Sequence, residues 1–285
     1  MLTQPKRILI IRRDNIGDLV CTTPAIAALR KRFPDAEIGA LVNSYNAEVL
    51  RGNPNVDHVF VYKKLKHAGG LANRFKALAE RLRLIKRLRR WKPDVTILAK
   101  ASYDRHGLSF ARQIGAKNII GFVPEAPGMA KGLPDIQLET PDFIGLHEVE
   151  AVAGLLAPLE ITESMGPLQV FPESSVVNGI QNQLPPANKR IALHISAREP
   201  ERRWGNDNFI ALARHILATQ PNTQILLFWS PGKADDPHHP GDDEAAASLI
   251  QAVQSDRLVP MPTQNITELI AALSLWDLFI GIDGG

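Results

Sequence analysis

Cysteine is nearly absent from this chain, and long apolar runs are missing. The single cysteine, Cys21, cannot form an internal disulfide and cannot build a structural zinc site alone. No run reaches the roughly 18 apolar residues of a membrane-spanning helix. The apolar run Ile8–Ile11 is too short for the core of a secretory signal peptide, and Arg12 and Arg13 end it. These absences predict a cytoplasmic protein.

Charge is distributed unevenly along the 285 residues. The formal net charge is only +3, yet the segment from Lys63 to Lys92 holds twelve Lys or Arg and one acid, Glu80. The remainder of the chain is therefore net acidic. A basic segment on an acidic body predicts an anionic partner at one place, such as phosphate, a membrane surface or nucleic acid.

Strand-like and helix-like segments alternate along the chain, which favours an α/β fold with parallel, doubly wound sheets. The length suggests two domains. We place the first at 1–171, a linker rich in Pro, Asn and Gln at 172–189, and a second alternating pattern at 190–285. Strands are expected at 7–12, 37–42, 56–62, 95–99, 118–122, 191–195, 224–229 and 278–282. Loop is expected at 123–142, and helices at 106–114, 145–157, 207–218, 242–254 and 266–275.

The segment Arg13–Asp18 joins the first strand to the first helix, at the end of the sheet where ligands bind. We expect a turn at 15–18, in which Gly17 lets a ligand approach closely and Asp18 presents a carboxylate. The alternative is that Asp18 merely caps the helix and interacts with its dipole. No G-x-G-x-x-G pattern occurs, so a dinucleotide-binding fingerprint is not supported.

A second candidate site follows the strand at 191–195. Ser196 can donate a hydrogen bond, and Arg202 or Arg203 can neutralise a diphosphate. The alternative is a polar loop in which Trp204 packs as an anchor. Further along, a cluster of acids and histidines has no standard metal-ligand spacing, so no metal is expected: His238, His239, Asp242, Asp243 and Glu244.

The basic segment contains a long helix whose apolar residues recur at steps of three and four, which predicts a single apolar stripe. These residues are Leu71, Phe75, Leu78, Leu82, Ile85, Leu88 and Trp91. One interpretation is a core-packed helix with a solvated basic face. The other is contact with anionic lipid or an anionic acceptor through that face. Nucleic acid is not expected, because no aromatic interleaving or known binding module accompanies the charge.

Five motifs in order make the chain resemble the bacterial lipopolysaccharide heptosyltransferases, glycosyltransferase family nine. Arg13–Pro24 is similar to the family's N-terminal signature, and Ser109–Phe122 to its Ala-Arg-x-x-Gly-Ala segment. His147–Glu150 resembles its His-Glu motif, and Arg203-Trp204 its donor-side region. Trp276–Gly285 resembles the start of its Asp-(Ser/Thr/Gly)-Gly-x-x-His motif.

The resemblance implies a GT-B architecture, with an N-terminal acceptor-binding and a C-terminal nucleotide-sugar-binding Rossmann-like domain facing a cleft. It implies inverting transfer of heptose from ADP-heptose to the lipopolysaccharide inner core, with a lipid A–Kdo acceptor, at the inner face of the cytoplasmic membrane and without a metal. Asp18 would be the general base. Acceptor-side residues would be Arg13, Asn15, Gly17, Thr22 and Thr23. Donor contacts would be Ser196, Arg198, Arg202, Arg203, Glu244, Asp283, Gly284 and Gly285. Arg83, Arg87 and Arg90 would contact the anionic surface.

The chain also departs from the family pattern. Ala197 stands where many members keep a second hydroxyl, and the sequence ends at Gly285, before the histidine of the last motif. We therefore expect an incomplete second domain and weak binding of the ADP-sugar. Two alternatives stay open: a non-catalytic protein that binds the acceptor or anionic lipid, and a GT-B enzyme with another nucleotide sugar. An oxidoreductase is disfavoured by the missing glycine fingerprint.

Overall fold

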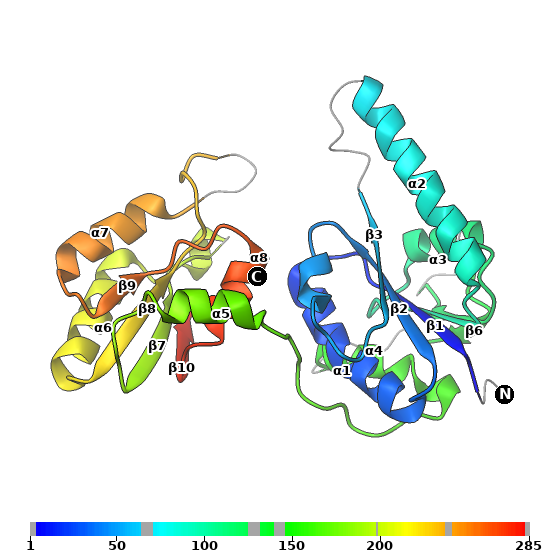
Figure 1. Cartoon of the computed structure of the whole chain (residues 1–285), viewed down its shortest axis with the longest axis horizontal. Helices are drawn as coiled ribbons and strands as arrows, with labels where there is room; N and C mark the ends of the chain where they lie inside the picture. Colours follow the sequence, from blue (N-terminus) through cyan, green and yellow to red (C-terminus); the bar gives the residue numbers. More distant parts are fainter. Residues whose placement is uncertain are drawn as a thin grey trace. The chain divides into compact units, whose positions relative to one another are not determined.

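The computed structural model describes residues 4–63, 71–124, 132–139, 146–197, 199–236 and 241–282. The chain forms two compact units that divide after Phe171, and each is described by itself (Figure 1). Both units combine parallel β-strands with helices, so the predicted α/β class is confirmed. Within the described residues, the chain offers no helix with the length and apolarity needed to pass through a bilayer.

The first unit is built on a six-stranded parallel sheet in the order β3-β2-β1-β4-β5-β6, the order of a Rossmann-type sheet. The strands are β1 (Arg7–Ile11), β2 (Glu37–Asn43), β3 (His58–Tyr62), β4 (Val95–Leu98), β5 (Ile119–Phe122) and β6 (Ile136–Leu138). Its helices are α1 (Ile16–Arg32), α2 (Leu71–Trp91), α3 (Arg105–Gln113) and α4 (Glu148–Gly154), with short 3-10 turns η1 (Ala47–Leu50) and η4 (Ala157–Leu159).

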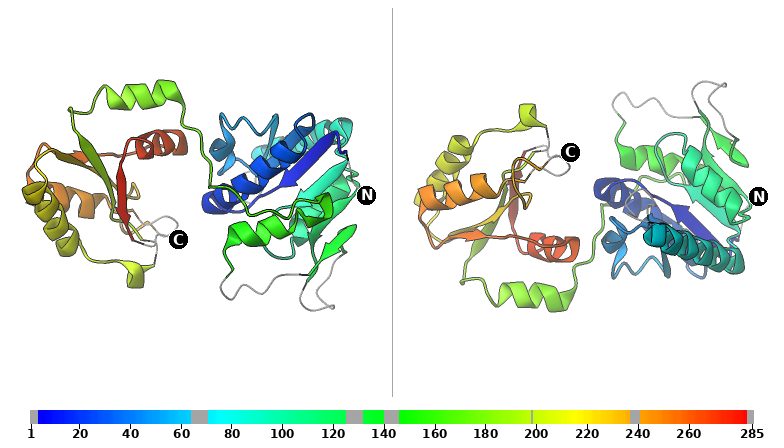
Figure 2. Two further views of the ribbon diagram at one scale, coloured as in Figure 1. Left: turned by 90° about the horizontal axis from the view of Figure 1, so that it is seen from below. Right: turned by 90° about the horizontal axis from the view of Figure 1, so that it is seen from above.

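Strand β1 is apolar throughout because both of its faces are covered. Ile8 and Ile10 pack into a core with α1 and α4, whereas Leu9 and Ile11 pack into a second core with α2 and α3. Side chains that alternate across a strand thus supply both cores in turn. Figure 2 gives two further views of these helix layers.

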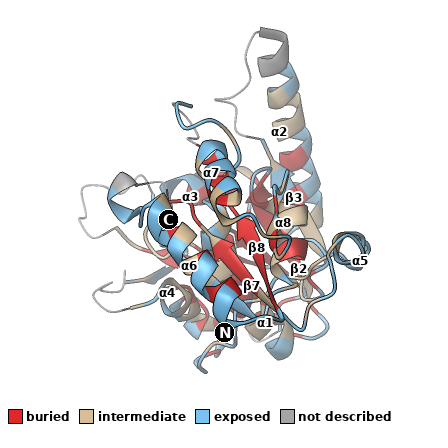
Figure 3. Cartoon of the chain, turned by 90° about the vertical axis from the view of Figure 1, so that its left-hand side faces the viewer, coloured by how far each residue is buried: buried red, intermediate tan, exposed pale blue. Residues whose placement is uncertain are grey.

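The second unit has a four-stranded parallel sheet in the order β10-β7-β8-β9. The strands are β7 (Lys189–His194), β8 (Thr223–Phe228), β9 (Leu258–Pro260) and β10 (Leu278–Gly281). The helices are α5 (Ser174–Gln181), α6 (Asn206–Thr219), α7 (Asp243–Val253) and α8 (Ile266–Leu273), with the 3-10 turn η5 (Pro200–Arg202). One core lies with α6 and α7 and the other with α5 and α8. In Figure 3, β7 and β8 are mostly red, and α6 turns a pale blue face to solvent.

The two sheets begin with the same topology. Read from β9, the second sheet runs through its third, second, first and fourth strands, which is how the first sheet starts from β3. In such sheets the connections leave in opposite directions on either side of the first strand, and ligands bind where the order reverses. This predicts a site beside β1 and β4 in one unit, and beside β7 and β10 in the other.

Several expected elements differ from the observed ones. The stretch 123–142 contains β6, and β9 was not expected; both are three-residue strands, too short for a periodicity signal. The linker expected at 172–189 contains α5, which packs on α8, so this expectation is corrected. Its apolar Ile180 joins the core of the second unit despite the surrounding polar residues.

The predicted single stripe on the basic helix is wrong. Leu84, Ile85 and Leu88 of α2 are buried against the sheet, whereas Phe75 and Leu82 of the same helix are exposed. Thirteen residues at 100° each place Phe75 and Leu88 about 140° apart around the helix axis. Repeated steps of three and four residues therefore moved the apolar positions gradually around the helix, so that they do not share one face.

Candidate active site

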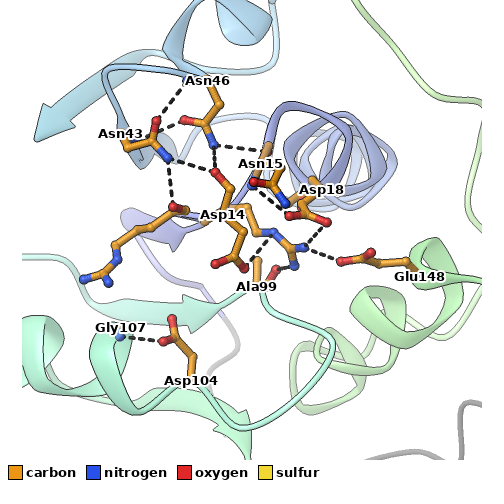
Figure 4. Close-up of polar contacts among 12 residues, drawn as sticks. Asp14, Asn15, Asp18, Asn43, Asn46, Ala99, Asp104, Gly107 and Glu148 are labelled. Carbon is orange, nitrogen blue, oxygen red and sulfur yellow. Dashed lines mark hydrogen bonds and ion pairs between the residues drawn. The ribbon is translucent and has the colours of Figure 1, made fainter. Parts of the chain in front are cut away.

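The candidate site lies at the carboxyl ends of β1 and β4, where the strand order of the first sheet reverses. The backbone stays paired just beyond the strands: Arg12 donates its N–H to the Leu41 carbonyl, and Ala99 donates to the Ile11 carbonyl, each at 3.0 Å. The loop 13–15 then leads into α1. Side chains from several separate segments meet here (Figure 4).

Arg12 forms the centre of this cluster. Its side chain is only 2% exposed, and its Nη1 donates to the carbonyl of Ala99. Its Nη2 pairs with Glu148 and lies 3.3 Å from Asp18 Oδ1, and its Nε lies 3.6 Å from Asp14 Oδ2. Three carboxylates around one buried cation leave the cluster net negative. Such a field disfavours a phosphate and suits neutral hydroxyl groups.

Asp18 lies in the first turn of α1, so the turn expected at 15–18 is instead the start of a helix. Its Oδ2 accepts the backbone N–H of Asn15 at 2.8 Å, which satisfies one of the helix's unpaired donors. The capping role considered from the sequence is therefore present. The side chain keeps 24% of its surface exposed, so a ligand can still reach the carboxylate.

Two buried asparagines shape the loop before α1. Asn43 Nδ2 donates to the carbonyls of Arg13 and Asp14, and Asn46 Nδ2 donates to those of Asp14 and Asn15. The two residues also bond to each other, since Asn46 N donates to Asn43 Oδ1 and Asn43 N donates to Asn46 Oδ1. Three consecutive carbonyls are thus held by side chains from the end of β2.

The residues expected on the acceptor side divide into two groups. Arg13, Asn15 and Gly17 lie in or beside the loop and are at least partly exposed. Arg13 stacks over the Tyr62 ring at 5.0 Å, and burial raises the pKa of Tyr62. A Cβ added to Gly17 would meet nothing within 4 Å, so there is open space in front of it. Its φ is not positive, so the backbone conformation at this position does not itself require glycine.

Thr22 and Thr23 are fully buried, which corrects the expectation that they contact an acceptor. Thr22 Oγ1 donates to the Asp18 carbonyl at 2.8 Å. Thr23 Oγ1 donates to the Val20 carbonyl at 2.7 Å, the group that Pro24 cannot satisfy because it has no N–H. The Thr-Pro pair of the motif therefore keeps α1 continuous through its proline.

Cys21 lies on the same helix. Burial raises the pKa of its thiol, and the carboxylate of Glu148 raises it further. Since the thiolate is the reactive form, this thiol is poorly suited to be a nucleophile at neutral pH.

In the second unit, the predicted donor residues lie after β7 and β8. Ser196 is 5% exposed, and its Oγ accepts the backbone N–H of Ser230 at 2.7 Å, which ties together the ends of the two strands. Arg203 pairs with the buried carboxylate of Asp242 at 3.1 Å and donates through Nε to the Ala197 carbonyl. Arg202 ends the turn η5 and is exposed.

His194 and Glu244 lie at the same end of this sheet. Burial lowers the pKa of the His194 imidazole, and the nearby Asp242 carboxylate partly opposes that effect. Glu244 occupies the first turn of α7 and is exposed. Trp204, considered as a packed anchor, is 48% exposed and stands edge-on to the ring of Phe209.

Other predicted residues lie outside the described part of the chain. These are Arg198, His238, His239, Asp283, Gly284 and Gly285. Among the residues that the structure does describe, no cluster of three His, Cys, Asp or Glu side chains could hold a metal ion.

Arg12, Glu148, Asn43 and Asn46 were missing from the predicted site. Glu148 belongs to the His-Glu motif, where His147 and Glu150 form the N-terminal capping box of α4. The only available signal for Arg12 was a charged residue that directly follows an apolar strand. That position is equally typical of a solvated strand end, so the signal was ambiguous.

Comparisons with known proteins agree with this fold. The model of the family described as glycosyltransferase family 9 (heptosyltransferase) matches residues 81–285. A putative glycosyltransferase of Haemophilus influenzae is 39% identical over 59 residues, which are 21% of this chain and 17% of that protein. Lipopolysaccharide heptosyltransferase 3 of Escherichia coli is 33% identical over 81 residues, or 28% of this chain and 22% of that protein. The chain thus matches about a fifth of the length of these curated relatives.

Solved structures are similar over nearly the whole chain. A glycosyl transferase family 9 protein from Veillonella parvula has a TM-score of 0.78 at 21% identity and covers 99% of this chain and 76% of its own. The E. coli heptosyltransferase WaaC with ADP has a TM-score of 0.70 at 17% identity, with 98% and 82% covered. At these identities the likeness shows the fold alone.

Proposed function

The chain belongs to glycosyltransferase family 9, and we propose that it transfers heptose from ADP-heptose to the inner core of lipopolysaccharide. The acceptor hydroxyl oxygen attacks the anomeric carbon from the face opposite the ADP, so the configuration inverts. The new glycosidic C–O bond forms as the bond to the β-phosphate oxygen breaks. ADP leaves with that electron pair, and the hydroxyl proton passes to the Asp18 carboxylate.

The observation that carries this proposal is the partly exposed Asp18 carboxylate, held by Arg12 at the switch point of the first sheet beside the open space at Gly17. Arg12 fixes the orientation of the carboxylate. When Asp18 takes up a proton, the Arg12 charge still faces Glu148 and Asp14. The buried cation therefore stays compensated in both protonation states of the base.

We assign the donor to the second unit and the acceptor to the first. The net negative cluster around Arg12 repels a diphosphate, whereas Ser196 and the arginines of the second unit can bind one. Arg203 is engaged with Asp242 and the Ala197 carbonyl. Arg202 is exposed at the end of η5 and is the other candidate for charge neutralisation. Arg198, Glu244 and Asp283–Gly285 join the donor side by resemblance to the family, and no metal is required in this scheme.

The proposed acceptor is a lipid A–Kdo molecule, and the protein would meet it as a peripheral protein at the inner face of the cytoplasmic membrane. The exposed arginines Arg83 and Arg90 of the basic helix support this placement. Arg87, which was expected to join them, lies over the Phe60 ring at 4.8 Å and packs toward its own unit.

Asp18→Asn tests the proposal. Loss of the general base should lower the transfer rate by about 10²–10⁴-fold. ADP-heptose affinity, measured by calorimetry, should stay unchanged. Asp14→Asn is the matched control, since it removes a carboxylate beside the same arginine but leaves Asp18 in place. Equal turnover by wild type and Asp18→Asn would eliminate the base assignment.

A second candidate function is a non-catalytic protein that binds the acceptor. The capping bond from Asn15 to Asp18 favours it, because a carboxylate used for structure needs no chemical role. Acceptor binding without any transfer by the wild-type chain would support this candidate over the first.

A further inference from the structure

Helix α2 is buried at one end and exposed at the other. Its C-terminal half packs on the sheet of the first unit through Leu84, Ile85 and Leu88. Its N-terminal half extends beyond that sheet (Figure 1). Three large apolar side chains on this half and at the middle of the helix face solvent: Phe75 is 69% exposed, Leu78 45% and Leu82 58%.

These three residues form a second stripe on the helix, which we call the outer stripe. At 100° per residue, Phe75, Leu78 and Leu82 fall within about 60° of one another. Around the helix axis the outer stripe lies about 80–140° from Leu88 and about 20–80° from Ile85, so it is next to the buried face and is exposed on the part of the helix that extends beyond the sheet. Large apolar side chains grouped on one exposed helix face mark an interaction surface, because single exposed ones are ordinary but grouped ones are not.

The cations of the helix separate into two sets. Arg81 and Arg89 donate to Gln113, and Arg87 lies over Phe60, so these three are bound within the unit. Four others are exposed and make no ion pair or hydrogen bond among the described residues: Lys76, Arg83, Lys86 and Arg90. On the helix surface these four lie beside the outer stripe, within about 100° of Phe75.

We propose that α2 docks on an anionic lipid bilayer, with the outer stripe inserted among the acyl chains and the four exposed cations at the headgroup phosphates. Apolar side chains beside long basic ones are typical of helices that lie in the membrane interface, because Lys and Arg reach the phosphates while their stems stay in apolar surroundings. This inference deepens the membrane part of the proposed function and rests on α2 alone.

The four exposed cations beside the outer stripe favour an anionic bilayer over the other partners that could cover this surface. A second copy of this chain would bring four more cations against the same face, and like charges in contact are unfavourable. Nucleic acid would match the cations but would gain nothing from Phe75, Leu78 and Leu82. An anionic lipid surface satisfies both halves of the pattern.

Co-sedimentation with vesicles of phosphatidylglycerol and phosphatidylcholine tests the contribution of the outer stripe. Phe75→Ser with Leu82→Ser should weaken the partition coefficient by about 100-fold, roughly tenfold for each side chain. Leu168→Ser is the matched control, since Leu168 is a similarly exposed leucine (51%) outside α2. Because all these side chains are exposed, the thermal unfolding curves should coincide with that of the wild type.

The same co-sedimentation assay tests the contribution of the exposed cations. Arg83→Gln, Lys86→Gln and Arg90→Gln should each weaken partition by about fivefold at low salt, and vesicles of pure phosphatidylcholine should bind weakly. Arg87→Gln is the control, because that guanidinium covers Phe60 and should contribute little.

Three outcomes overturn the proposal: partition unchanged in the double serine variant, no preference for phosphatidylglycerol, or a wild-type dimer that the serine variant converts to monomers. The last would make the outer stripe an interface between copies. Asp18→Asn should bind vesicles like the wild type. A wild-type chain that binds vesicles but transfers no heptose counts against the proposed function only. A wild-type chain that transfers heptose to a delipidated acceptor but does not bind vesicles counts against this inference only.

Discussion

Strands β4 and β10 occupy the same place in the two units, next to the first strand of each sheet, yet they differ in burial. Every residue of β4 is buried, whereas Leu278 and Phe279 of β10 are each 44% exposed. Strand β4 pairs with β1 and with β5. Within the described residues, β10 pairs with β7 alone. Equivalent places in the two sheets therefore do not give equal burial, because side-chain burial also depends on what covers the faces of each strand.

The two units also differ in how they treat charge at the corresponding sheet ends. The first buries one arginine among three carboxylates next to Asp18. The second pairs Arg203, 37% exposed, with a single acid, Asp242. In the first unit the cation is the buried group and several carboxylates hold it in one geometry, whereas in the second unit the carboxylate of Asp242 is the buried group and the cation is partly exposed.

The largest expected difference between the two units is in the loss of stability when an apolar side chain is removed from β4 or from β10. Ile97→Ala in β4 should cost about 3 kcal/mol of unfolding free energy, because Ile97 is 1% exposed and leaves a cavity. Phe279→Ala in β10 should cost about 1 kcal/mol or less, since Phe279 is already 44% exposed. Urea unfolding followed by tryptophan fluorescence measures both. Equal costs would mean that the outer edge of β10 is covered in solution.

A smaller contrast is expected between two glycines at helix starts. Gly205, at the N-cap of α6, has φ +92°, so Gly205→Ala should cost about 2 kcal/mol. Gly17 has an ordinary φ and open space, so Gly17→Ala should leave stability unchanged. The added methyl should nonetheless slow transfer by roughly tenfold to 100-fold if the acceptor approaches there. Unchanged turnover in Gly17→Ala would separate this space from the acceptor.

The smallest expected effect is a difference in acid sensitivity. Burial lowers the pKa of His194 below 6.5, so the unfolded chain binds a proton that the folded second unit resists. The second unit should therefore lose stability as the pH falls below about 6.5. In the first unit, hydrogen bonds from Trp91 and His58 lower the pKa of Glu37 below 4.5, and this stability is lost only below about 4.5.

Hydrogen exchange resolved by unit between these two pH values checks the acid prediction. Amides of the second unit should exchange faster as the pH approaches 4.5, after correction for the intrinsic rate, and those of the first should not. His194→Gln should remove the difference. Equal loss of amide protection in both units would show that a group other than His194 causes the acid sensitivity.

The sequence was sufficient for the fold class and for most of the longer elements. Short continuous runs of apolar residues predicted β1, β2 and β8, because strands that are buried on both faces are apolar at nearly every position. The cap at Asn265, whose Oδ1 accepts the Glu268 N–H, follows from local spacing. The pattern of a strand followed by a helix predicted that Asp18 lies after the carboxyl end of β1, and the structure has it in the first turn of α1.

The rest depends on contacts that no local pattern records. Arg12 meets Glu148 across 136 positions, and Asn43 reaches the loop from another strand. Hydrophobic periodicity placed Phe75 and Leu88 on one stripe because it cannot tell where the sheet under α2 ends. The buried hydroxyls of Thr22 and Thr23 were assigned to a ligand because a motif shows which residues recur but not whether they serve folding or binding.

The asparagine pair at the end of β2 has a consequence for affinity. Fixing a flexible backbone costs about 1–2 kcal/mol per residue, and a loop that orders only on binding subtracts that cost from its ligand's affinity. In this chain, Asn43 and Asn46 bear the cost during folding, since the carbonyls of residues 13–15 are already fixed. Under the proposed function, an acceptor sugar beside Asp18 would meet a preorganised surface, and its full contact energy would remain for selectivity.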